Sequence, residues 1–443
     1  MQIPLYSVRS PVDAEEFFTV LNGRTAACAS ISGGVDAVAE QVAAILEQVR
    51  SRGLEAVLEY TRRFDAPEFR EEQFAPDEEA LDRAVSAVSA CDLAVIRRAW
   101  ENIRSFHEND KEQSRFETRP EGGIVGRLVR PVDRAGLYVP GGKGGETPLV
   151  SSLLMGAAPA LAAGVPEIAV LSPPRRDGSV NPHIAAAARM IGLKEIYAAG
   201  SAWAVAALAY GAGPLRAVDV VAGPGNIHVS AAKHLLRGRI GVDMVAGPSE
   251  ICIVTDASAP PAWIAADMLA QAEHDEMASA VLICTEDATA QAVRSELERR
   301  CAQAARRDTA RASLARFGAI VRVPDTETAA ALVNRIAPEH LELVVSDPWS
   351  LLHQIRNAGA IFLGRYSAEV FGDYCAGPNH VLPTMGTARF SSGLSVSTFC
   401  KRSSLLALNR AFAAEFARDT AALARLEGLE AHAQAALCRL EDN

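Results

Sequence analysis

The chain has 443 residues, which is enough for two or three domains with a large buried core. Apolar residues make up 49% and charged residues 22%, which are values of globular proteins. The net charge is -10 and no block of Lys or Arg stands out, which argues against a surface for nucleic acid or anionic membranes. A small molecule is therefore the expected ligand.

The first residues, up to about Ile31, have no clean strand-helix pattern and are expected to form an N-terminal arm. They lack a basic stretch followed by an apolar core, so no secretory signal is predicted. The longest apolar region, 150–165, is interrupted by Ser, Gly and Pro and falls short of the roughly 20 residues of a membrane span. Eight cysteines without a C-x-x-C pair are interpreted as reduced, buried apolar residues of a cytoplasmic protein.

Three helices are expected next, over 35–50, 54–64 and 77–109, and Asp77 is the predicted N-cap of the third. From Gly123 onwards strands alternate with helices, beginning with 124–129 and a short strand from Arg134 that runs into a glycine-rich loop. The later strands are expected at 167–171, 195–198 and 217–221, and then at 251–255, 280–284, 320–323, 341–345 and 360–363.

Alternation of this kind, with apolar strands, predicts an α/β protein with parallel sheets covered on both faces. The two series of strands predict two Rossmann-like halves, although the halves have no sequence identity that would establish a repeat. Residues 391–443 return to a helical pattern and are expected to form a tail.

Two glycine-rich turns follow predicted strands, at 138–145 and 222–228. Neither is a G-x-G-x-x-G or a Walker sequence. Each places small residues where a strand gives way to a helix N-terminus, the position at which backbone N–H groups favour a phosphate. Either turn alone is as well explained as a tight connection, whereas the two together favour a nucleotide crevice.

A helix from about Pro261 is expected to end in the sequence Gln271-Ala272-Glu273-His274. Positions three apart lie on one helical face, so Gln271 and His274 can reach a common metal ion. The alternative is that this segment is only the solvated polar end of an amphipathic helix. Glu339 and His340 stand at a predicted loop-strand junction, where they are either catalytic groups or an ordinary polar turn.

Several short motifs follow one another along nearly the whole chain. The most specific is the block from Gly247-Pro248-Ser249-Glu250 to Gln271-Ala272-Glu273-His274. The other motifs are Leu137 to Gly142, Gly223 to Asn226, Ala337 to Glu342, Gly372-Asp373, Gly377 to His380 and Glu427 to His432. Taken together and in this order, the motifs resemble those of the histidinol dehydrogenase family.

The resemblance implies a zinc-dependent, NAD-linked, four-electron oxidation of L-histidinol to L-histidine through L-histidinal, the last steps of histidine biosynthesis. It implies an intertwined homodimer whose chains each have two incomplete Rossmann-like domains, with active sites shared between chains. The expected division is an arm over 1–31, a first domain over 32–137 and 250–336, an NAD-side second domain over 138–249 and 337–382, and a helical tail over 383–443.

Carried over by motif, the expected zinc ligands are Gln271, His274, Asp373 and His432. The expected substrate contacts are the same residues with Ser249, His340 and Glu427, and the expected NAD contacts are Tyr138, Trp203 and Asn226. Imidazole, carboxylate and amide oxygen form a plausible cage for zinc.

The chemistry assigns His340 as the base for the hydroxyl proton and Glu339 as the carboxylate that activates water for the aldehyde step. His380 is either a stabiliser of developing alkoxide charge or a structural group. Trp203 departs from the family, which has glutamine at that position, and the loop after Gly142 is a few residues longer than usual. An enzyme acting on another amino alcohol or diol, and a zinc hydrolase with Glu339 as its base, are the alternatives.

Overall fold

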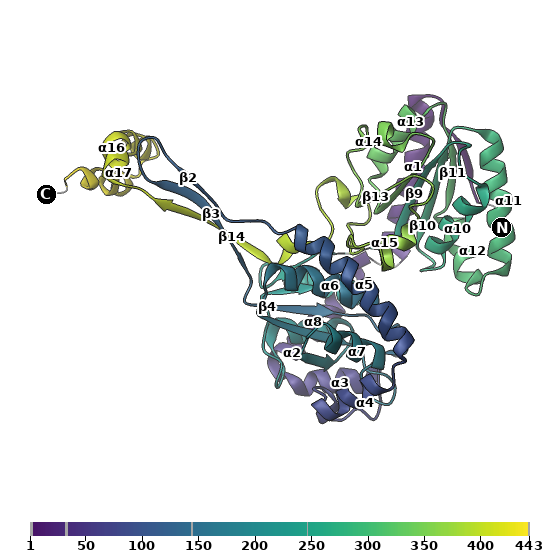
Figure 1. Cartoon of the computed structure of the whole chain (residues 1–443), viewed down its shortest axis with the longest axis horizontal. Helices are drawn as coiled ribbons and strands as arrows, with labels where there is room; N and C mark the ends of the chain where they lie inside the picture. Colours follow the sequence, from purple (N-terminus) through teal and green to yellow (C-terminus); the bar gives the residue numbers. More distant parts are fainter. Residues whose placement is uncertain (1–2, 32–33, 143–144, 246, 442–443) are drawn as a thin grey trace.

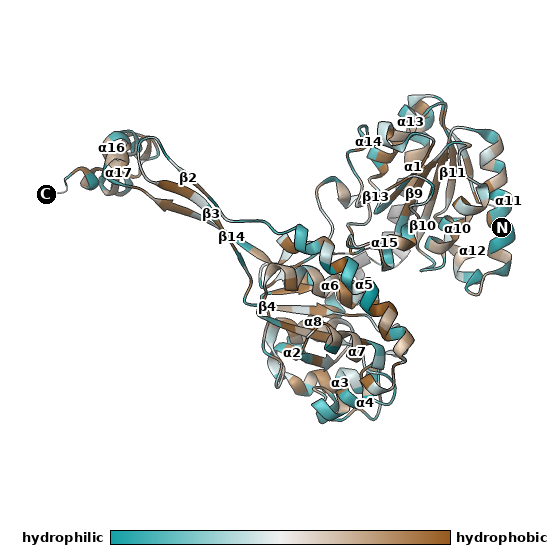
Figure 2. Cartoon of the chain, in the orientation of Figure 1, coloured by the Kyte–Doolittle hydropathy of each residue, from teal (hydrophilic) through white to brown (hydrophobic). Residues whose placement is uncertain are grey.

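The structure, a computed structural model, describes residues 3–31, 34–142, 145–245 and 247–441. The chain forms two lobes and a long protruding arm (Figure 1). Brown, apolar strands lie in the middle of both lobes, and the helices around them carry the polar residues (Figure 2). Among the described residues, the strands form one five-stranded, one six-stranded and one three-stranded sheet.

The five-stranded sheet is parallel, with the order β6-β5-β4-β7-β8. The chain enters at the central strand β4, moves outward to β6 and then returns to place β7 on the other side of β4. The direction of the order therefore changes between β4 and β7, which is the topological switch point of a doubly wound sheet. The strands are β4 (Arg134–Tyr138), β5 (Glu167–Ser172), β6 (Glu195–Ala198), β7 (Val220–Ala222) and β8 (Gly241–Val242).

Eight helices surround this sheet among the residues described. α5 and α7 pack on α6, while α2 packs on α8 and α9. The predicted helix over 77–109 is two helices, because Ser89 accepts the N–H of Asp92 and caps a new start. Asp77 is confirmed as an N-cap, accepting the N–H of Ala80 at 2.8 Å. The helices are α2 (Gly34–Arg52), α3 (Leu54–Phe64), α4 (Glu78–Ser86), α5 (Ala90–Asn109), α6 (Val150–Ala163), α7 (Pro182–Met190), α8 (Ser201–Tyr210) and α9 (Ile227–Leu236).

The six-stranded sheet is also parallel, with the order β1-β11-β10-β9-β12-β13. Without the edge strand β1, this order repeats that of the five-stranded sheet, with the switch point between β9 and β12. The repeat supports two Rossmann-like halves. The strands are β1 (Leu5–Ser7), β9 (Glu250–Thr255), β10 (Ser279–Cys284), β11 (Ala319–Arg322), β12 (His340–Val344) and β13 (Ala360–Leu363).

Alternate residues of β9 enter two separate cores, one on each face of the sheet. Ile251 and Ile253 pack with residues of α10 to α12, whereas Cys252 and Val254 pack with α1 and α13. None of the helices in the described part of the chain is both long and apolar enough to cross a membrane. The helices of this lobe are α1 (Pro11–Ile31), α10 (Pro261–Ala272), α11 (Asp287–Gln303), α12 (Arg307–Arg316), α13 (Thr326–Ile336), α14 (Pro348–Leu352) and α15 (Glu369–Tyr374).

Strand pairing corrects the expected domain boundaries. Residues 337–363 do not return to the NAD-side sheet, because β12 pairs with β9 and β13 pairs with β12. Residues 34–109 pack on the five-stranded sheet instead of joining 250–336. The predicted cut between 137 and 138 falls inside β4. The described part of 1–31 is no free arm, since β1 pairs with β11 and Phe17 and Phe18 are buried.

The protruding arm consists of a three-stranded antiparallel sheet and a helical tip. It contains β2 (Arg115–Thr118), β3 (Ile124–Pro131), β14 (Cys400–Ala407), α16 (Arg410–Leu426) and α17 (Glu430–Leu437). The expected helical tail is therefore helical only at its end, because β14 pairs with β3 along eight residues. This pairing carries α16 and α17 away from both lobes (Figure 1).

Candidate active site

A cluster of histidine, carboxylate and amide side chains lies at the amino edge of the six-stranded sheet. β9 begins at Glu250 and the neighbouring strand β12 begins at His340. The end of α10 contributes Gln271, and α15 contributes Asp373. The motifs that are far apart in the sequence are thus brought together by one strand pair and the two helices beside it.

The carboxyl edge of the same strand pair is closed. Thr255 donates its hydroxyl to the carbonyl oxygen of Val344 at 3.0 Å, and Asp256 accepts the N–H of Ser346 at 2.8 Å. Open α/β sheets commonly bind ligands in the crevice at this edge. In this lobe the crevice is bridged by side chains, so the amino edge is the one that presents reactive groups.

Both predicted catalytic residues are buried, with Glu339 6% and His340 4% exposed. Glu339 Oε2 accepts the N–H of Glu250 at 2.8 Å, and His340 Nδ1 lies 3.0 Å from the carbonyl oxygen of Glu250. Because a carbonyl can only accept, Nδ1 carries the proton and Nε2 presents a lone pair. Nε2 is buried without a hydrogen-bond partner in the described residues. A neutral imidazole in this state can accept a proton from a ligand.

Gln271 and His274 keep their predicted spacing through a turn. α10 ends at Ala272, and the N–H of His274 donates to the carbonyl oxygen of Gln271 at 3.2 Å. Gln271 is 0% exposed, and neither Oε1 nor Nε2 has a hydrogen-bond partner within the described ranges. An unpaired buried amide costs about 1–3 kcal/mol, so this side chain is expected to meet a ligand.

Glu369 is a member of the cluster that the sequence motifs missed. It is buried on α15, four residues before Asp373, and its Oε1 lies 3.5 Å from His340 Nδ1. His340, Glu369 and Asp373 offer ligand atoms that all lie within 4.8 Å of one another. Glu342 accepts the N–H of Glu369 at 2.7 Å and so holds the start of α15. The spacing of two carboxylates by four residues was the available signal.

Burial shifts the acid-base properties of the cluster. It raises the pKa of Asp373 to about 6 and the pKa values of Glu339 and Glu369 well above their ordinary range. It also lowers the pKa values of His340 and His380 to about 4. The three carboxyl groups are short of compensating charge, and a bound cation would supply it.

The loop that carries His380 is held by a helix of the other lobe. Asn102 of α5 donates its amide to the carbonyl oxygen of Cys375 at 2.8 Å. Asn379 donates its amide to Nε2 of His107, also on α5, at 3.1 Å. His107 is therefore a buried packing residue that joins the two lobes.

The single chain gathers only part of the predicted site. Ser249 precedes β9 directly, and His274 is exposed at the mouth of the cluster, close enough to affect the pKa of His340. Glu427 and His432 are exposed on the arm, whose helical tip lies far from α10 and α15 (Figure 1). Within one chain these two residues do not reach the other predicted ligands.

The two glycine-rich turns lie at the carboxyl ends of β4 and β7, the neighbouring strands at the switch point. Gly223 has φ of 122°, and a Cβ at this residue would lie 2.0 Å from the carbonyl oxygen of Tyr138. Position 223 therefore accepts only glycine, because any side chain there would clash with the carbonyl oxygen of Tyr138. Asn226 caps α9, accepting the N–H groups of His228 and Val229. Residues 143–144 of the longer loop and Ala246, directly before Gly247 of the Gly-Pro-Ser-Glu block, lie outside the described residues.

Trp203 is packed inside the lobe. Its ring is 5% exposed and stacks with Tyr60 and Phe64, with ring centroids 5.8 and 5.5 Å away. Its Nε1 donates to the Thr61 hydroxyl at 3.2 Å. The Trp203 ring therefore has no open face for the predicted contact with a cofactor, whereas the neighbouring Phe64 is 52% exposed. Tyr138 is also buried, and its hydroxyl accepts the N–H of Ser201 at 3.1 Å.

Comparison with known proteins agrees with the motifs. The sequence profile described as histidinol dehydrogenase matches residues 31–440. A histidinol dehydrogenase of Nitratidesulfovibrio vulgaris is 59% identical over 404 residues, covering 91% of this chain and 93% of its own. Another, of Oleidesulfovibrio alaskensis, is 55% identical over 396 residues, covering 89% and 91%. The crystal structure of histidinol dehydrogenase from Elizabethkingia anophelis superposes with a TM-score of 0.90 at 30% identity, covering 99% of this chain and 98% of that one.

Proposed function

The chain belongs to the histidinol dehydrogenase family, an NAD-dependent group of oxidoreductases acting on the alcohol of histidinol, and from this premise we propose a zinc-dependent route from L-histidinol through L-histidinal to L-histidine. The main support is a set of buried nitrogen and oxygen atoms that have no hydrogen-bond partner among the described residues. These atoms belong to Gln271, His340 and Glu369. Such a set is costly to bury unless a cation and a polar substrate complete it.

Zinc would be held by Gln271, His274, Asp373 and the partner subunit's His432. The fit rests on donor type, because amide oxygen, imidazole and carboxylate are all zinc ligands. It also rests on the unpaired Gln271 amide and the raised pKa of Asp373, both of which a nearby cation would compensate. When bound, the ion orients the imidazole and amino nitrogens of the substrate.

His340 would take the hydroxyl proton of histidinol at Nε2, since its Nδ1 is occupied by the Glu250 carbonyl. Bound NAD would supply the hydride acceptor for both oxidations, one NAD for each, and the first oxidation would leave histidinal. Glu339 would then remove a proton from water as the water adds to the aldehyde carbon. Burial raises the pKa of Glu339 well above its ordinary range, and a nearby cation would lower it again, so that the ionised carboxylate could accept this proton.

NAD would bind at the switch point of the five-stranded sheet, over the turns that follow β4 and β7. The support is the close approach of Gly223 to Tyr138 and the start of α9 at Asn226. Trp203 has no part in this proposal, because its ring is buried. An exposed aromatic ring is available nearby on Phe64, which stacks on Trp203.

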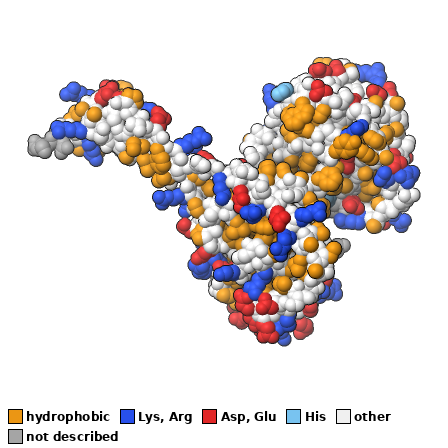
Figure 3. Space-filling view, viewed as in Figure 1, with side chains coloured by type: hydrophobic (Ala, Val, Ile, Leu, Met, Phe, Trp, Pro, Cys, Tyr) orange, Lys and Arg blue, Asp and Glu red, His pale blue; other side chains and the backbone are white. Residues whose placement is uncertain are grey.

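A homodimer would complete each site with the tail of the other chain. The arm carries Glu427 and His432 away from their own cluster and presents large apolar side chains, with Leu426 84% exposed. Orange apolar side chains lie along the strands of the arm (Figure 3). Covering them against a second copy would remove apolar surface from water and bring His432 to the other three ligands.

The test is the yield of NADH from purified protein with limiting L-histidinol and excess NAD. The proposal predicts two NADH for each histidinol, loss of the reaction in chelator and recovery with zinc. NADH from another amino alcohol or a diol, but none from histidinol, would favour the related dehydrogenase. Hydrolytic activity without NADH would favour the zinc hydrolase.

A further inference from the structure

A buried ion pair lies directly behind the turn that follows β7. Lys233, on the second turn of α9, and Asp243, just after β8, are joined through Nζ and Oδ1, and their side chains are 3% and 0% exposed. A buried charge pair of this kind seldom adds net stability compared with apolar residues of the same volume. Net stability is therefore a poor explanation for this pair, and its other contacts are the more informative feature.

Both members of the pair hold one residue of the turn. Asp243 Oδ2 accepts the N–H of Gly223 at 2.8 Å, and Lys233 Nζ donates to the carbonyl oxygen of Gly223. The N–H of Gly223 is thus held by a carboxylate and its carbonyl oxygen by an ammonium group. Hydrogen bonds to charged groups are stronger than neutral ones, so the orientation of this residue is firmly set.

Gly223 needs such a hold because its backbone is unusual. Its φ of 122° is rarely adopted by other residues, and it lies against the carbonyl oxygen of Tyr138 at the end of β4. Glycine is also the most flexible residue of the unfolded chain, so fixing it costs conformational entropy. The ion pair supplies the hydrogen bonds that keep the turn at the switch point in one conformation.

We propose that Lys233 and Asp243 are positioning residues for the dinucleotide, acting through Gly223 to preorganise the turn from Gly223 to Asn226. The proposal rests on the NAD site proposed above. Preorganised sites bind more tightly because less freedom is lost on binding. The pair touches no reacting atom, and its effect is expected on NAD and not on histidinol.

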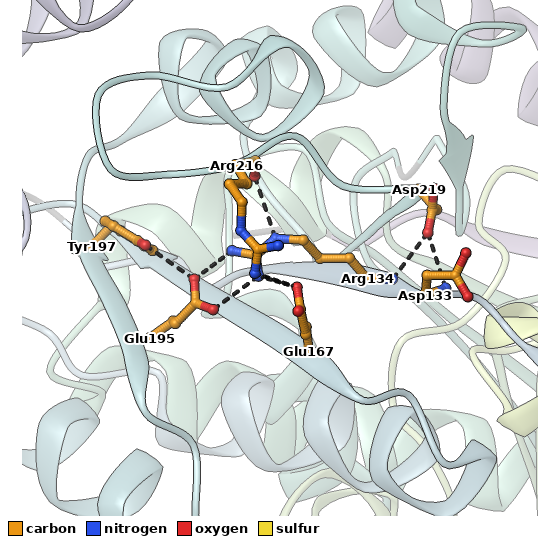
Figure 4. Close-up of polar contacts among 7 residues, drawn as sticks. All are labelled: Asp133, Arg134, Glu167, Glu195, Tyr197, Arg216 and Asp219. Carbon is orange, nitrogen blue, oxygen red and sulfur yellow. Dashed lines mark hydrogen bonds and ion pairs between the residues drawn. The ribbon is translucent and has the colours of Figure 1, made fainter.

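The opposite edge of the same sheet offers a matched control. Arg134, at the amino end of β4, is equally buried and pairs with Glu167 and Glu195 at the amino ends of β5 and β6 (Figure 4). It also donates to the carbonyl oxygen of Arg216. This cluster joins three strands at the edge away from the glycine turns, so it should support folding without shaping the cofactor site.

The experiment compares NAD dissociation constants from calorimetry, measured without substrate on the full-length protein. The variants are Lys233→Met/Asp243→Leu, which leaves no unpaired charge, and the control Arg134→Met. In metal sites, removal of the outer partners of ligating groups typically costs roughly 10- to 100-fold in affinity or activity. We expect a weakening of that size in the double variant, a higher KM for NAD and an unchanged KM for histidinol, whereas Arg134→Met lowers the melting temperature and keeps NAD affinity within about twofold.

An unchanged NAD affinity in the folded double variant overturns the inference, as does an equal loss in Arg134→Met. If the double variant does not fold, Lys233→Met decides, because it removes both the donor to the carbonyl oxygen of Gly223 and the charge that pairs with Asp243. An NAD affinity several-fold weaker than that of wild type supports the positioning role, and an NAD affinity within twofold of wild type refutes it. Absence of NAD binding by the wild type contradicts the proposed function instead.

Discussion

Gln271→Met should make the metal-free protein more stable and the zinc-loaded protein less stable than wild type. The Gln271 amide is fully buried, and neither polar atom finds a hydrogen-bond partner in the part of the chain that the structure describes. Methionine is similar in length and apolar, so it fills the same space without an unpaired donor or acceptor.

The size of each effect follows from the burial. Removing an unpaired buried amide should raise the free energy of unfolding without metal by about 1–3 kcal/mol. With zinc at 1,000 times its dissociation constant, wild type should gain about 4.1 kcal/mol from binding. The variant lacks one of the proposed ligands and should gain much less. The two proteins should therefore change rank when zinc is added.

Urea unfolding in chelator and in excess zinc measures both states. A matched control is Asn379→Leu, since the Asn379 amide is also buried but bonds to Met155, His107 and Val381. That variant should lose stability under both conditions. A Gln271→Met protein that is less stable in chelator, or that zinc stabilises as much as wild type, would refute the metal-ligand interpretation.

Three further predictions concern single residues. Glu339→Gln should slow oxidation of histidinal more than oxidation of histidinol, by roughly 10²- to 10⁴-fold for the aldehyde step; equal slowing of both half-reactions in stopped-flow assays would contradict its role. Burial lowers the pKa of His107 from 6.5 to about 4, so its contribution to stability is complete above pH 6.5 and is lost as pH falls towards 4. Relative to His107→Gln, the unfolding free energy of wild type should drop by up to about 3 kcal/mol across that interval. If urea titrations gave the same difference between the two proteins at every pH, His107 would not be the titrating group. Trp203→Gln should lower the unfolding free energy by roughly 2–4 kcal/mol through lost packing, with little change in the KM for NAD; a selective rise of that KM would return Trp203 to the cofactor site.

Strand and helix positions could be predicted closely because hydrophobic periodicity is a local property. The strands at 195–198 and 360–363 were predicted with the observed bounds. The partner of each strand is not local, and the assignment of β12 to the wrong sheet illustrates this. A short apolar run indicates a buried strand, but its own residues do not specify which neighbouring strand supplies its hydrogen bonds.

The site could be predicted where residues formed short motifs and was missed where burial alone defines the role. Glu339 directly precedes β12 and His340 is its first residue, as expected for a loop-strand junction. Glu369 was missed because a glutamate at the start of a short helix is normally exposed to solvent. Its burial beside His340 depends on the packing of α15 against β12. Trp203 was placed by alignment, and its packing against α3 depends on contacts 142 residues apart.

Mixed dimers test most directly whether one active site uses two chains. His340→Asn and His432→Ala chains, each inactive alone, are unfolded together and refolded. Random pairing gives roughly half heterodimers, and each heterodimer then holds one site with both changes and one with neither, so roughly a quarter of wild-type NADH formation from histidinol should return. A mixture that stays inactive while both variants dimerise would mean that each tail serves its own chain.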